Sequence, residues 1–392
     1  MASANPRLRV GSRPEELAEN REGTNIAENI VIGSKQKSLL MIEDYWVGSL
    51  HFSEPFGDDT LARLNALPPV QARNGKTYKI QAEHVTIHEV NLDYRTKYRL
   101  ILDRFSYLYP QAIGLFMGFA FRGVYLINNP FSFYYYLRNK DAAYMVVKEL
   151  GISIPKTYIL PPKEAPALKA EDFKYHKFFD WQGMAEDLGW PIVIKPAEGR
   201  EAIGVEIAYN MEQLLYFYDR SGSQVMMIQE KVKSPYPWQI RALCIGRKII
   251  PIKYIFRKFD ASEYLFDPEF LTPEMGKKVI DTCRIINRAL GYEMNSVELF
   301  IDEQGELQAI DFNNPVPDGR LKALGEIFYN DYQQALCDLV VDIVREQRPF
   351  DFLPPDVNRF AQIARRADLT REQKFQMALE LANHYYEPRD PE

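Results

Sequence analysis

Short apolar runs alternate with a helical pattern along the first third of the chain. Four segments have the length and composition of buried strands, at residues 39–42, 84–90, 98–102 and 123–127. Between the last two, the apolar stretch 110–121 predicts a helix. Strands that alternate with helices are typical of an open α/β sheet. We therefore expect an N-terminal α/β domain over residues 37–138.

Beyond residue 138 the pattern changes to helices that end at glycines and to strands joined by tight turns. The helix expected at 140–150 is followed by Gly151, and the one at 273–290 by Gly291. A hairpin is expected around Gly246. Further strands are expected at residues 191–194, 204–208, 225–228, 296–301 and 307–312. The charged segment from residue 346 onward predicts helices.

Composition is that of a globular protein. The 392 residues suffice for two or three domains of about 150 residues each, and 46% of them are hydrophobic. The net charge of -6, without a basic block, argues against nucleic-acid binding. The longest apolar run, 113–121, is too short to span a bilayer, and no secretory signal is recognised. We expect a poorly ordered arm at 1–36 and a soluble, cytoplasmic protein with neither membrane nor nucleic-acid partners.

Cysteine and histidine provide no metal-binding motif in the sequence. The three cysteines are far apart and odd in number, which excludes a disulfide framework or a paired zinc motif and favours a reducing compartment. His84 and His88 lie in one expected strand, and no third ligand accompanies them. We therefore interpret these two histidines as structural.

The segment after the expected strand 191–194 has the composition of a phosphate-binding loop. Lys195 ends the strand, and Gly199 and Gly204 bracket the loop before the next strand. Glycines let a backbone fold closely over phosphates, and a lysine supplies the matching charge. The two glycines have P-loop spacing, but Val205 stands where that motif requires lysine. The alternative is a plain hairpin with a surface lysine.

Three oxygen-bearing side chains gather on the last two expected strands. Asp311 and Asn313 lie two residues apart and so share one face of a strand. If Asp302 pairs with Leu307 across the turn, Glu298 lies opposite Asp311 on that face, whereas a shift of one residue moves it to the other face. Two carboxylates and an amide oxygen suit a hard cation such as Mg²⁺. The alternative is a solvated acidic strand face.

Two further segments carry weaker signals. Gln229, Glu230 and Val232 follow the strand 225–228, where backbone groups can meet a planar base. The alternative for this segment is an ordinary linker. Arg241 alternates with apolar residues on its strand, so it either faces anionic chemistry or forms an ion pair at the edge of a sheet.

In this order and spacing, the motifs resemble the ATP-grasp superfamily, in particular the branch of glutathione synthetase and the ribosomal-protein glutamate ligase. The resemblance covers residues 98–344. It rests on the segments DRFSYLYP, INNP, NKDAAYMVVKELGISIP, PIVIKPAEGREAIGV, IQEKV, IRALCIGRKI, SVELFI and AIDFNNPVPDGR. Several such motifs in the right order are far more specific than any one of them.

The resemblance implies a three-part ATP-grasp architecture in which two sheets clamp ATP. The fold class is then α/β, with an α+β ATP-grasp half. The implied parts are an N-terminal pre-ATP-grasp α/β domain at 37–138, a central subdomain at 139–233, a C-terminal subdomain with the metal site at 234–345 and a helical extension at 346–392.

The resemblance also implies roles for the residues singled out above. ATP contacts are implied for Lys140, Lys195, Glu198, Gly199, Gly204, Gln229, Glu230 and Val232. Gln239 stands where relatives often have an acidic ribose ligand. Arg241, together with Lys195, would neutralise charge at the transferred phosphoryl group. Two Mg²⁺ ions, or Mn²⁺ as an alternative, would be held by Glu298, Asp311 and Asn313.

The implied activity is that of an ADP-forming carbon–nitrogen ligase. Transfer of the γ-phosphoryl group to a carboxylate gives an acyl phosphate, and an amine attacks it to form an amide or peptide bond. The partners would be a small-molecule or peptide carboxylate and an amine or amino acid, and relatives often form homo-oligomers. Two alternatives stay open: a kinase of the same fold that phosphorylates a small molecule, and a nucleotide-binding regulator without catalysis.

Two departures from the family pattern concern the phosphate loop and the acceptor. Ala202 replaces a glycine found in many relatives. The segment 257–264 lacks the glycine-rich acceptor motif of the glutamate-ligase branch, which predicts a different substrate. Lys253, Arg257 and Arg320 are candidate contacts for a substrate carboxylate, and solvated surface charge is the alternative for all three.

Overall fold

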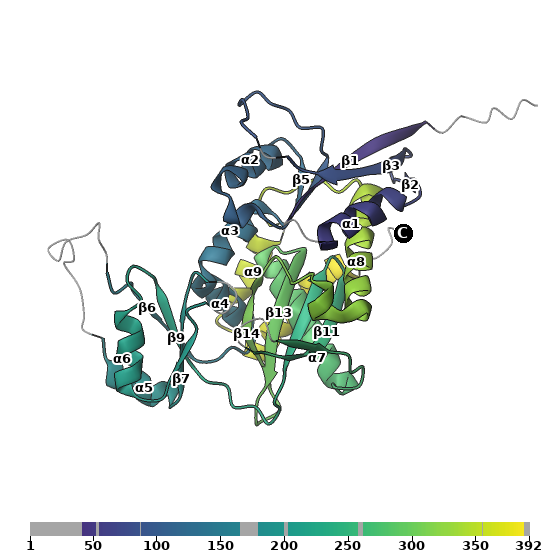
Figure 1. Cartoon of the computed structure of the whole chain (residues 1–392). Coiled ribbons are helices and arrows are strands. Elements are labelled where there is room, and N and C mark those ends of the chain that lie inside the picture. The colour runs from purple at the N-terminus through teal and green to yellow at the C-terminus, as the bar shows by residue number, and fades with distance from the viewer. Residues whose placement is uncertain are drawn as a thin grey trace, which may run out of the picture. The chain divides into compact units, whose positions relative to one another are not determined.

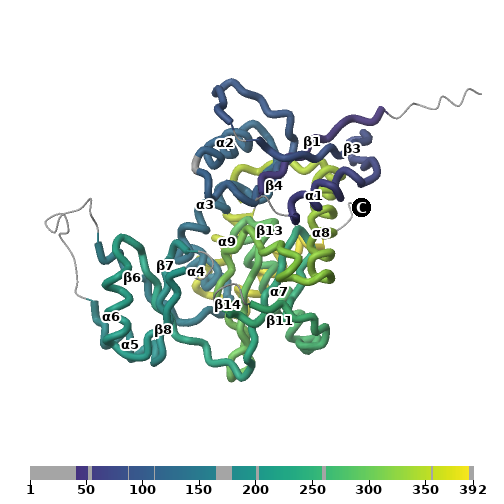
Figure 2. Tube along the Cα trace, viewed as in Figure 1, coloured from purple at the N-terminus to yellow at the C-terminus, as the bar shows by residue number. Residues whose placement is uncertain are grey.

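The computed structural model describes residues 41–51, 55–86, 88–164, 179–199, 203–257, 262–354 and 356–387. The arm expected at 1–36 lies outside these residues. From Met41 onward the chain forms one compact unit, and its described residues contain three β-sheets (Figures 1 and 2). None of the described helices is both long and apolar enough to cross a bilayer.

The first sheet has the strand order β2-β3-β1-β4-β5. Its strands are β1 (Ile42–Leu50), β2 (Val70–Gln71), β3 (Thr77–His84), β4 (Leu100–Asp103) and β5 (Tyr125–Ile127). β2 is antiparallel to β3, and the other neighbours are parallel. The helices of this part are α1 (Pro55–Ala66), the short 3₁₀ helix η1 (Ser106–Leu108), α2 (Pro110–Phe121) and α3 (Pro130–Arg138). The open α/β sheet expected from the sequence is confirmed.

The strand expected at 39–42 is wrong in its bounds. Residues 39 and 40 lie outside the described part of the chain, and β1 begins at Ile42 and continues through Glu43 and Asp44 to Leu50. Met41 is 81% exposed and Ile42 57% exposed, so these two residues are not the buried part of the strand. The reason lies in strand pairing. The first half of β1 pairs with β3 alone, whereas Val47–Leu50 lies between β3 and β4 and is buried throughout.

The strand expected at 84–90 is also wrong, because β3 ends at its first residue, His84. His84 is the partner of Ser49, and β1 ends one residue after Ser49, so no strand remains for β3 to pair with. The apolar residues that follow leave the sheet. Val85 packs instead against a cluster that includes Phe116 and Phe119 of α2.

The second sheet is antiparallel, with the order β6-β9-β7-β8. It comprises β6 (Thr157–Leu160), β7 (Ile192–Pro196), β8 (Glu206–Ala208) and β9 (Met226–Glu230), with α5 (Trp181–Leu188) and α6 (Met211–Asp219) packed on one face. Leu188 and Leu214 of these helices share a core with Ile192 and Ile194 of β7. The alternate position on β7, Lys195, therefore belongs to the opposite face.

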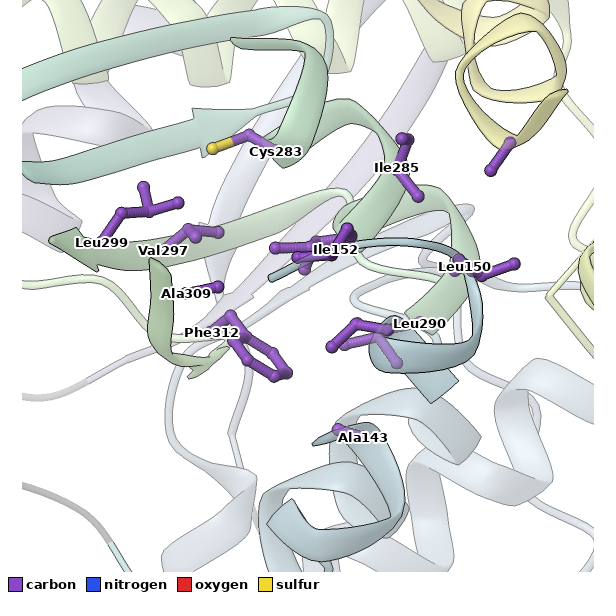
Figure 3. Close-up of a cluster of buried hydrophobic side chains, with 14 of the residues drawn as sticks. Ala143, Leu150, Ile152, Cys283, Ile285, Leu290, Val297, Leu299, Ala309 and Phe312 are labelled. Atoms are coloured by element: carbon purple, nitrogen blue, oxygen red, sulfur yellow. The ribbon is translucent and has the colours of Figure 1, made fainter. Parts of the chain in front are cut away.

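The third sheet is antiparallel as well, with the order β12-β11-β10-β13-β14. Its strands are β10 (Gln239–Ile245), β11 (Lys248–Ile255), β12 (Glu263–Leu265), β13 (Met294–Ile301) and β14 (Leu307–Asn314). Helix α7 (Pro273–Leu290) has the bounds expected from the sequence. Figure 3 shows Cys283 and Ile285 of α7 together with Val297 and Leu299 of β13 in one apolar cluster.

Helices from distant parts of the chain complete the cover of the third sheet. The α7 face also receives α4 (Lys140–Glu149) and α10 (Arg371–Tyr386), and α9 (Val357–Ala364) packs beside them. The opposite face meets α8 (Leu321–Glu346), whose Tyr332 and Leu336 share a cluster with Leu243 of β10. The expected C-terminal helices are therefore present. The domain boundaries expected within residues 37–392 stay predictions.

Candidate active site

A carboxylate pair forms on β13 and β14. Glu298 lies opposite Asp311, as one of the two registers considered above requires. The condition stated for that register, a pairing of Asp302 with Leu307, is not met, because the turn pairs Leu307 with Ile301. If that register continued along the strands without interruption, Glu298 would lie opposite Ile310 and not opposite Asp311. One additional residue on β14 is needed to bring them together.

A β-bulge at Ile310 supplies that residue. Ile310 precedes the Glu298–Asp311 pair and has no partner of its own on β13. Its carbonyl oxygen accepts a hydrogen bond from Lys195 Nζ at 3.1 Å and another from the Tyr144 hydroxyl. The bulge thus sets the register of the carboxylates and at the same time directs a backbone acceptor at a buried lysine.

Two buried lysines, one from α4 and one from β7, contact the consecutive residues Asp311 and Ile310 of β14. Lys140 opens α4 and places Nζ 3.0 Å from Asp311 Oδ2. Lys195 of β7, held by the bulge carbonyl, also donates to the Tyr144 hydroxyl at 2.8 Å. The backbone N–H of Lys140 donates to the Ala197 carbonyl at 3.1 Å, which fixes the start of α4 beside the end of β7. Lys195 is only 9% exposed, so it is not the surface lysine of a plain hairpin.

Burial and neighbouring charge set the ionisation of these groups. Desolvation lowers the pKa of Lys195 to about 8; nearby Asp311 opposes this change, and Lys140 adds to it. Burial alone would raise the pKa of Asp311, but the charges of Lys140 and Lys195 outweigh it and hold this pKa below its usual value. Neighbouring charge thus favours the ionised form of Asp311, and burial weakens the hold of Lys195 on its proton.

Arg241 forms a second, largely buried ion pair, with Glu298. The two residues are partners across β10 and β13, and Arg241 Nη1 lies 3.1 Å from Glu298 Oε1. Gln239 Nε2 donates to the other carboxylate oxygen at 2.9 Å. Burial raises the pKa of Glu298 although Arg241 opposes the shift. Because β10 lies inside the sheet, Arg241 is ion-paired but is not at a sheet edge.

Asn313 carries an orphaned oxygen next to this carboxylate pair. The residue is 1% exposed, and its Nδ2 donates to the Tyr136 carbonyl at 2.8 Å. Its backbone N–H donates to Asp311. Its Oδ1 is buried and has no hydrogen-bond partner among the residues that the structure describes. An unpaired buried oxygen is costly, by about 1–3 kcal/mol. The backbone contact keeps Asn313 close to Asp311, and two carboxylates with an amide oxygen are a donor set that fits a hard divalent cation.

The described part of the phosphate loop is folded tightly over Pro196. A Cβ at Gly199 would lie 3.1 Å from the Pro196 ring and one at Gly204 3.3 Å from it. Gly204 also has a φ of 77°, a conformation that favours glycine. Glu198 Oε1 lies 3.7 Å from Arg138 Nε, and both side chains are exposed. Residues 200–202, with the departure at Ala202, lie outside the described part of the chain.

The residues expected beside the base follow β9. Gln229 is 3% exposed, and its Nε2 donates to Thr157 Oγ1 at 2.6 Å. Glu230 accepts a hydrogen bond from the Lys156 backbone N–H at 2.8 Å, and its own N–H donates to the Lys156 carbonyl. Val232 is half-buried just beyond the strand. These contacts fix the end of β9 against β6, and the contact of these residues with a base stays a prediction.

The three candidate substrate contacts have different surroundings. Lys253 pairs with Asp267 at 2.8 Å. It alternates with Ile252, which faces the α8 side, so Lys253 lies on the α7 face and the structure does not bring it to Arg241. Arg257 pairs with Glu263 at 3.0 Å on the exposed surface. Arg320 pairs with Asp318 at 2.8 Å.

Sequence reasoning missed Tyr144 and Asp318. Tyr144 is fully buried against Lys195, and its position one turn after Lys140 on α4 is a spacing that the sequence does show. Asp318 carries a pKa below its usual value, because the hydrogen bonds from Arg320 outweigh its burial, and Arg241 contributes in the same direction. Nothing in the local sequence indicates that Asp318 approaches Arg241, which lies on a distant strand.

Three α/β parts, with a buried ionic site between two antiparallel sheets, define the class of the fold. Neither a protein-family model nor a curated protein sequence matches the chain. Solved structures do. A RimK-domain ATP-grasp protein of Sphaerobacter thermophilus has a TM-score of 0.52 at 14% identity, and the match covers 76% of this chain and 99% of that one.

Two peptide-bound structures are similar as well. The macrocyclase MdnC of Microcystis aeruginosa, bound to its precursor peptide MdnA, has a TM-score of 0.53 at 11% identity, over 76% of this chain and 99% of that chain. The ATP-grasp ligase PsnB, in complex with a minimal precursor, has a TM-score of 0.50 at 12% identity, over 77% and 99%. The chain therefore has the ATP-grasp fold.

Proposed function

We propose that the protein is an ATP- and Mg²⁺-dependent, ADP-forming ligase that joins a carboxylate to an amine through an acyl phosphate. One observation carries the proposal: the cations Lys140, Lys195 and Arg241 contact Asp311, the Ile310 carbonyl and Glu298, where β7 approaches the sheet of β10, β13 and β14, and the orphaned Asn313 oxygen lies on the same strand as Asp311. The names of the structural neighbours, a macrocyclase and an ATP-grasp ligase with precursor peptides, support ligation and support a peptide as the source of the carboxylate.

Glu298, Asp311 and Asn313 would hold the metal, which we propose to be two Mg²⁺ ions. Bound there, Mg²⁺ would neutralise charge on the phosphate oxygens. Lys140 and Arg241 contact Asp311 and Glu298 directly. The cations that we propose to bind phosphate oxygens therefore lie beside the proposed metal ligands themselves.

The chain's own residues would do the remaining work by position. Lys140 and Lys195 bind phosphates, and Arg241 stabilises the charge that spreads over the phosphoryl group during transfer. Lys195 is already fixed by the Ile310 carbonyl and the Tyr144 hydroxyl, so it needs little reorganisation. Gln229, with its neighbours Glu230 and Val232, would line the base, Gln239 would lie near the ribose, and the loop of Glu198, Gly199 and Gly204 would close over the phosphates.

The reaction requires no protein nucleophile. An oxygen of the substrate carboxylate forms a bond to the γ-phosphorus, and the bond from that phosphorus to the β-phosphate oxygen breaks, which releases ADP. The amine nitrogen then bonds to the acyl carbon, loses a proton, and inorganic phosphate leaves. Arg320, whose partner Asp318 lies near Arg241, is the candidate that we favour for holding the acid, with Arg257 as a second candidate.

The test is ADP release with panels of acids and amines, combined with hydroxylamine trapping. Hydroxylamine converts an acyl phosphate into a hydroxamate, so a hydroxamate should form only when both ATP and the accepted acid are present. Asp311→Asn should lower the rate of ADP release by about 10²–10³-fold. Glu303→Gln removes an exposed carboxylate from the turn of the same hairpin and should leave the rate unchanged.

Two results would contradict the ligase proposal. A stable phosphorylated product that resists hydroxylamine and forms without an amine would identify a kinase. Nucleotide binding without turnover on a broad panel, unaffected by Asp311→Asn, would identify a regulator that does not use the metal site.

A further inference from the structure

A second group of metal-binding side chains lies at the carboxyl-terminal edge of the first sheet. His51 directly follows β1, His84 ends β3, and Asp58 lies in the first turn of α1. Ser49 and His84 are partners in the parallel pair of β1 and β3, so the ends of both strands meet at this edge. The donor atoms of the two histidines and the aspartate all lie within 4.8 Å of one another.

The spacing of the three donors matches that of ligands around one small cation. His84 Nε2 lies 3.0 Å from Asp58 Oδ1, and His51 Nε2 lies 3.9 Å from the same oxygen. Ligands at about 2.0–2.1 Å from a tetrahedral zinc ion stand roughly 3.3 Å apart. The two separations bracket that value, and the donor atoms of the two histidines lie within 4.8 Å of each other.

An orphaned ring nitrogen of His51 is the observation that points to a ligand. The side chain is 1% exposed, and Nε2 is buried without a hydrogen-bond partner in the described part of the chain. Ser49 Oγ lies 2.8 Å from the other ring nitrogen, Nδ1. If Nδ1–H donates to this hydroxyl, the lone pair remains on Nε2, as it does in metal-bound histidines whose second nitrogen is hydrogen-bonded.

The start of α1 holds the His51 ring in place. Gly57 leaves the space that the ring occupies, because a Cβ at this position would lie 1.8 Å from a His51 ring carbon. Glycine at the start of α1 thus lets the ring lie against the helix.

We propose that His51, Asp58 and His84 bind one divalent transition-metal ion of the zinc class. Two imidazoles and a carboxylate suit Zn²⁺, whereas Mg²⁺ prefers oxygen ligands only. With three protein ligands, the fourth position of a tetrahedral ion is left for water. This proposal is independent of the ligase proposal, since none of the three residues belongs to the nucleotide site.

The ion would link α1 to the ends of β1 and β3. Helix α1 also contacts the segment around Gly319, next to the proposed nucleotide site. Phe56 of α1 packs on Gly319, where a Cβ would lie 2.7 Å from the phenyl ring. The Arg104 guanidinium lies 4.5 Å from the centre of the same ring and donates to the Pro317 carbonyl at 3.1 Å. A metal on Asp58 would therefore brace the segment that leads to Arg320.

The experiment uses the full-length protein, stripped of metal with a chelator. It is dialysed against Zn²⁺ with Mg²⁺ in large excess, which occupies the oxygen ligands of the nucleotide site, and bound zinc is then measured. We expect one zinc ion per chain. His84→Gln and Asp58→Asn should each weaken zinc binding at least about tenfold, and Ser49→Ala, which removes the partner of Nδ1, by roughly 10–100-fold. His84 and Asp58 are exposed, so both variants should fold.

The matched control is His88→Gln, which removes another exposed histidine outside the cluster and should leave zinc binding unchanged. Cobalt in place of zinc should give the visible absorption bands of a tetrahedral site in the native protein, and these bands should be absent in His84→Gln. Failure of the native protein to retain zinc would overturn the proposal. So would zinc retained equally by His84→Gln, or zinc lost only in Asp311→Asn, which would assign the ion to the nucleotide site.

Discussion

The two sheets that approach the proposed nucleotide site are built differently. The sheet of β10–β14 has α7 on one face and α8 on the other. It supplies the three candidate metal ligands, which are two carboxylates and an amide oxygen, and the largely buried Arg241. The sheet of β6–β9 has α5 and α6 on one face, and it supplies Lys195 and the glycine loop. Among the described residues in the strands β6–β9, Met227 alone belongs to the hydrophobic cluster between α7 and the sheet of β10–β14.

This difference matches the demands on each side of the site. Buried charges need close, fixed partners, because a charge without a partner in the protein interior costs several kcal/mol. The doubly covered sheet provides such partners through strand register. A loop that closes over phosphates needs backbone freedom and few side-chain contacts. The smaller sheet provides that through Gly199 and Gly204, which face only Pro196 and the loop's own backbone among the described atoms near them.

The largest effect is expected when the charge of Arg241 is removed from the larger sheet. Arg241→Met should lower the rate of ADP release by about 10²–10³-fold, because charge on the transferred phosphoryl group loses its cation. The same change should reduce the free energy of unfolding by about 3–5 kcal/mol, because Glu298 stays buried without its partner. Enzyme kinetics and urea unfolding measure the two effects separately.

The double variant Arg241→Met/Glu298→Gln separates stability from chemistry. It removes both charges, so most of the lost stability should return, while ADP release should stay low. If activity returned together with stability, Arg241 would have only a structural role, and the assignment of the larger sheet as the source of fixed charge would be wrong.

Deletion of Ile310 tests the contact between the two sheets. Without the bulge, the register set at the turn would still pair Glu298 with the aspartate that follows, but the carbonyl that receives Lys195 and Tyr144 would be lost. Loss of a hydrogen bond to a charged group costs about 1.5–3 kcal/mol, so ATP affinity should fall roughly 10–100-fold. Calorimetric titration measures this affinity, and an unchanged affinity would show that the bulge serves the carboxylate register alone.

The pH dependence of nucleotide binding reports on the smaller sheet. The pKa of Lys195 in the free protein is about 8, below its usual value, and a bound phosphate should raise it. Binding should therefore take up a proton above pH 8, and ATP affinity should fall with rising pH, by at most about tenfold per pH unit. Calorimetry in buffers of different ionisation enthalpy measures the proton uptake. Lys195→Met should bind weakly and show none of this uptake, whereas Lys248→Gln, on the exposed surface, should behave as the native protein does.

The smallest expected effect comes from the glycine loop. Gly204→Ala should cost roughly 1 kcal/mol of stability, because its φ of 77° disfavours a side chain. Gly222→Ala is a matched control with a φ of 55° and open space around it, so it should lose about as much stability. ATP affinity should fall only in Gly204→Ala, whose new Cβ would press on Pro196. Equal affinities in both variants would contradict a role for the loop in nucleotide binding.

Much of the fold was predictable because the periodic pattern of the sequence reflects it directly. Helix α7 has its expected bounds, since a capping Thr272, an amphipathic stripe and a left-handed Gly291 all act locally. The strands expected at 39–42 and 84–90 share only one residue each with β1 and β3, because the pairing of strands in a parallel sheet depends on neighbours far away in the chain. Val47 and Ser49 are buried by β4, about fifty residues further along.

In the candidate sites, too, features set by adjacent segments were predictable from the sequence, and features set by distant segments were not. The opposition of Glu298 and Asp311 followed from two adjacent strands, but the bulge at Ile310 did not, because a bulge leaves no signature in apolar alternation. The group of His51, Asp58 and His84 depends on two parallel strands and a helix that meet at one edge. Three residues so far apart show no spacing rule, and His84 alone favoured a structural interpretation.

The central claim is that the orphaned Asn313 oxygen, with the carboxylates beside it, binds a metal–nucleotide complex. Thermal unfolding with and without Mg²⁺·ATP, on the native protein and on Asn313→Ala, tests it most directly. At 100 times the dissociation constant the ligand should add about 2.7 kcal/mol of stability. We predict a clear rise in Tm in the native protein that is much smaller in Asn313→Ala. No rise in the native protein, or the same rise in both, would contradict the account.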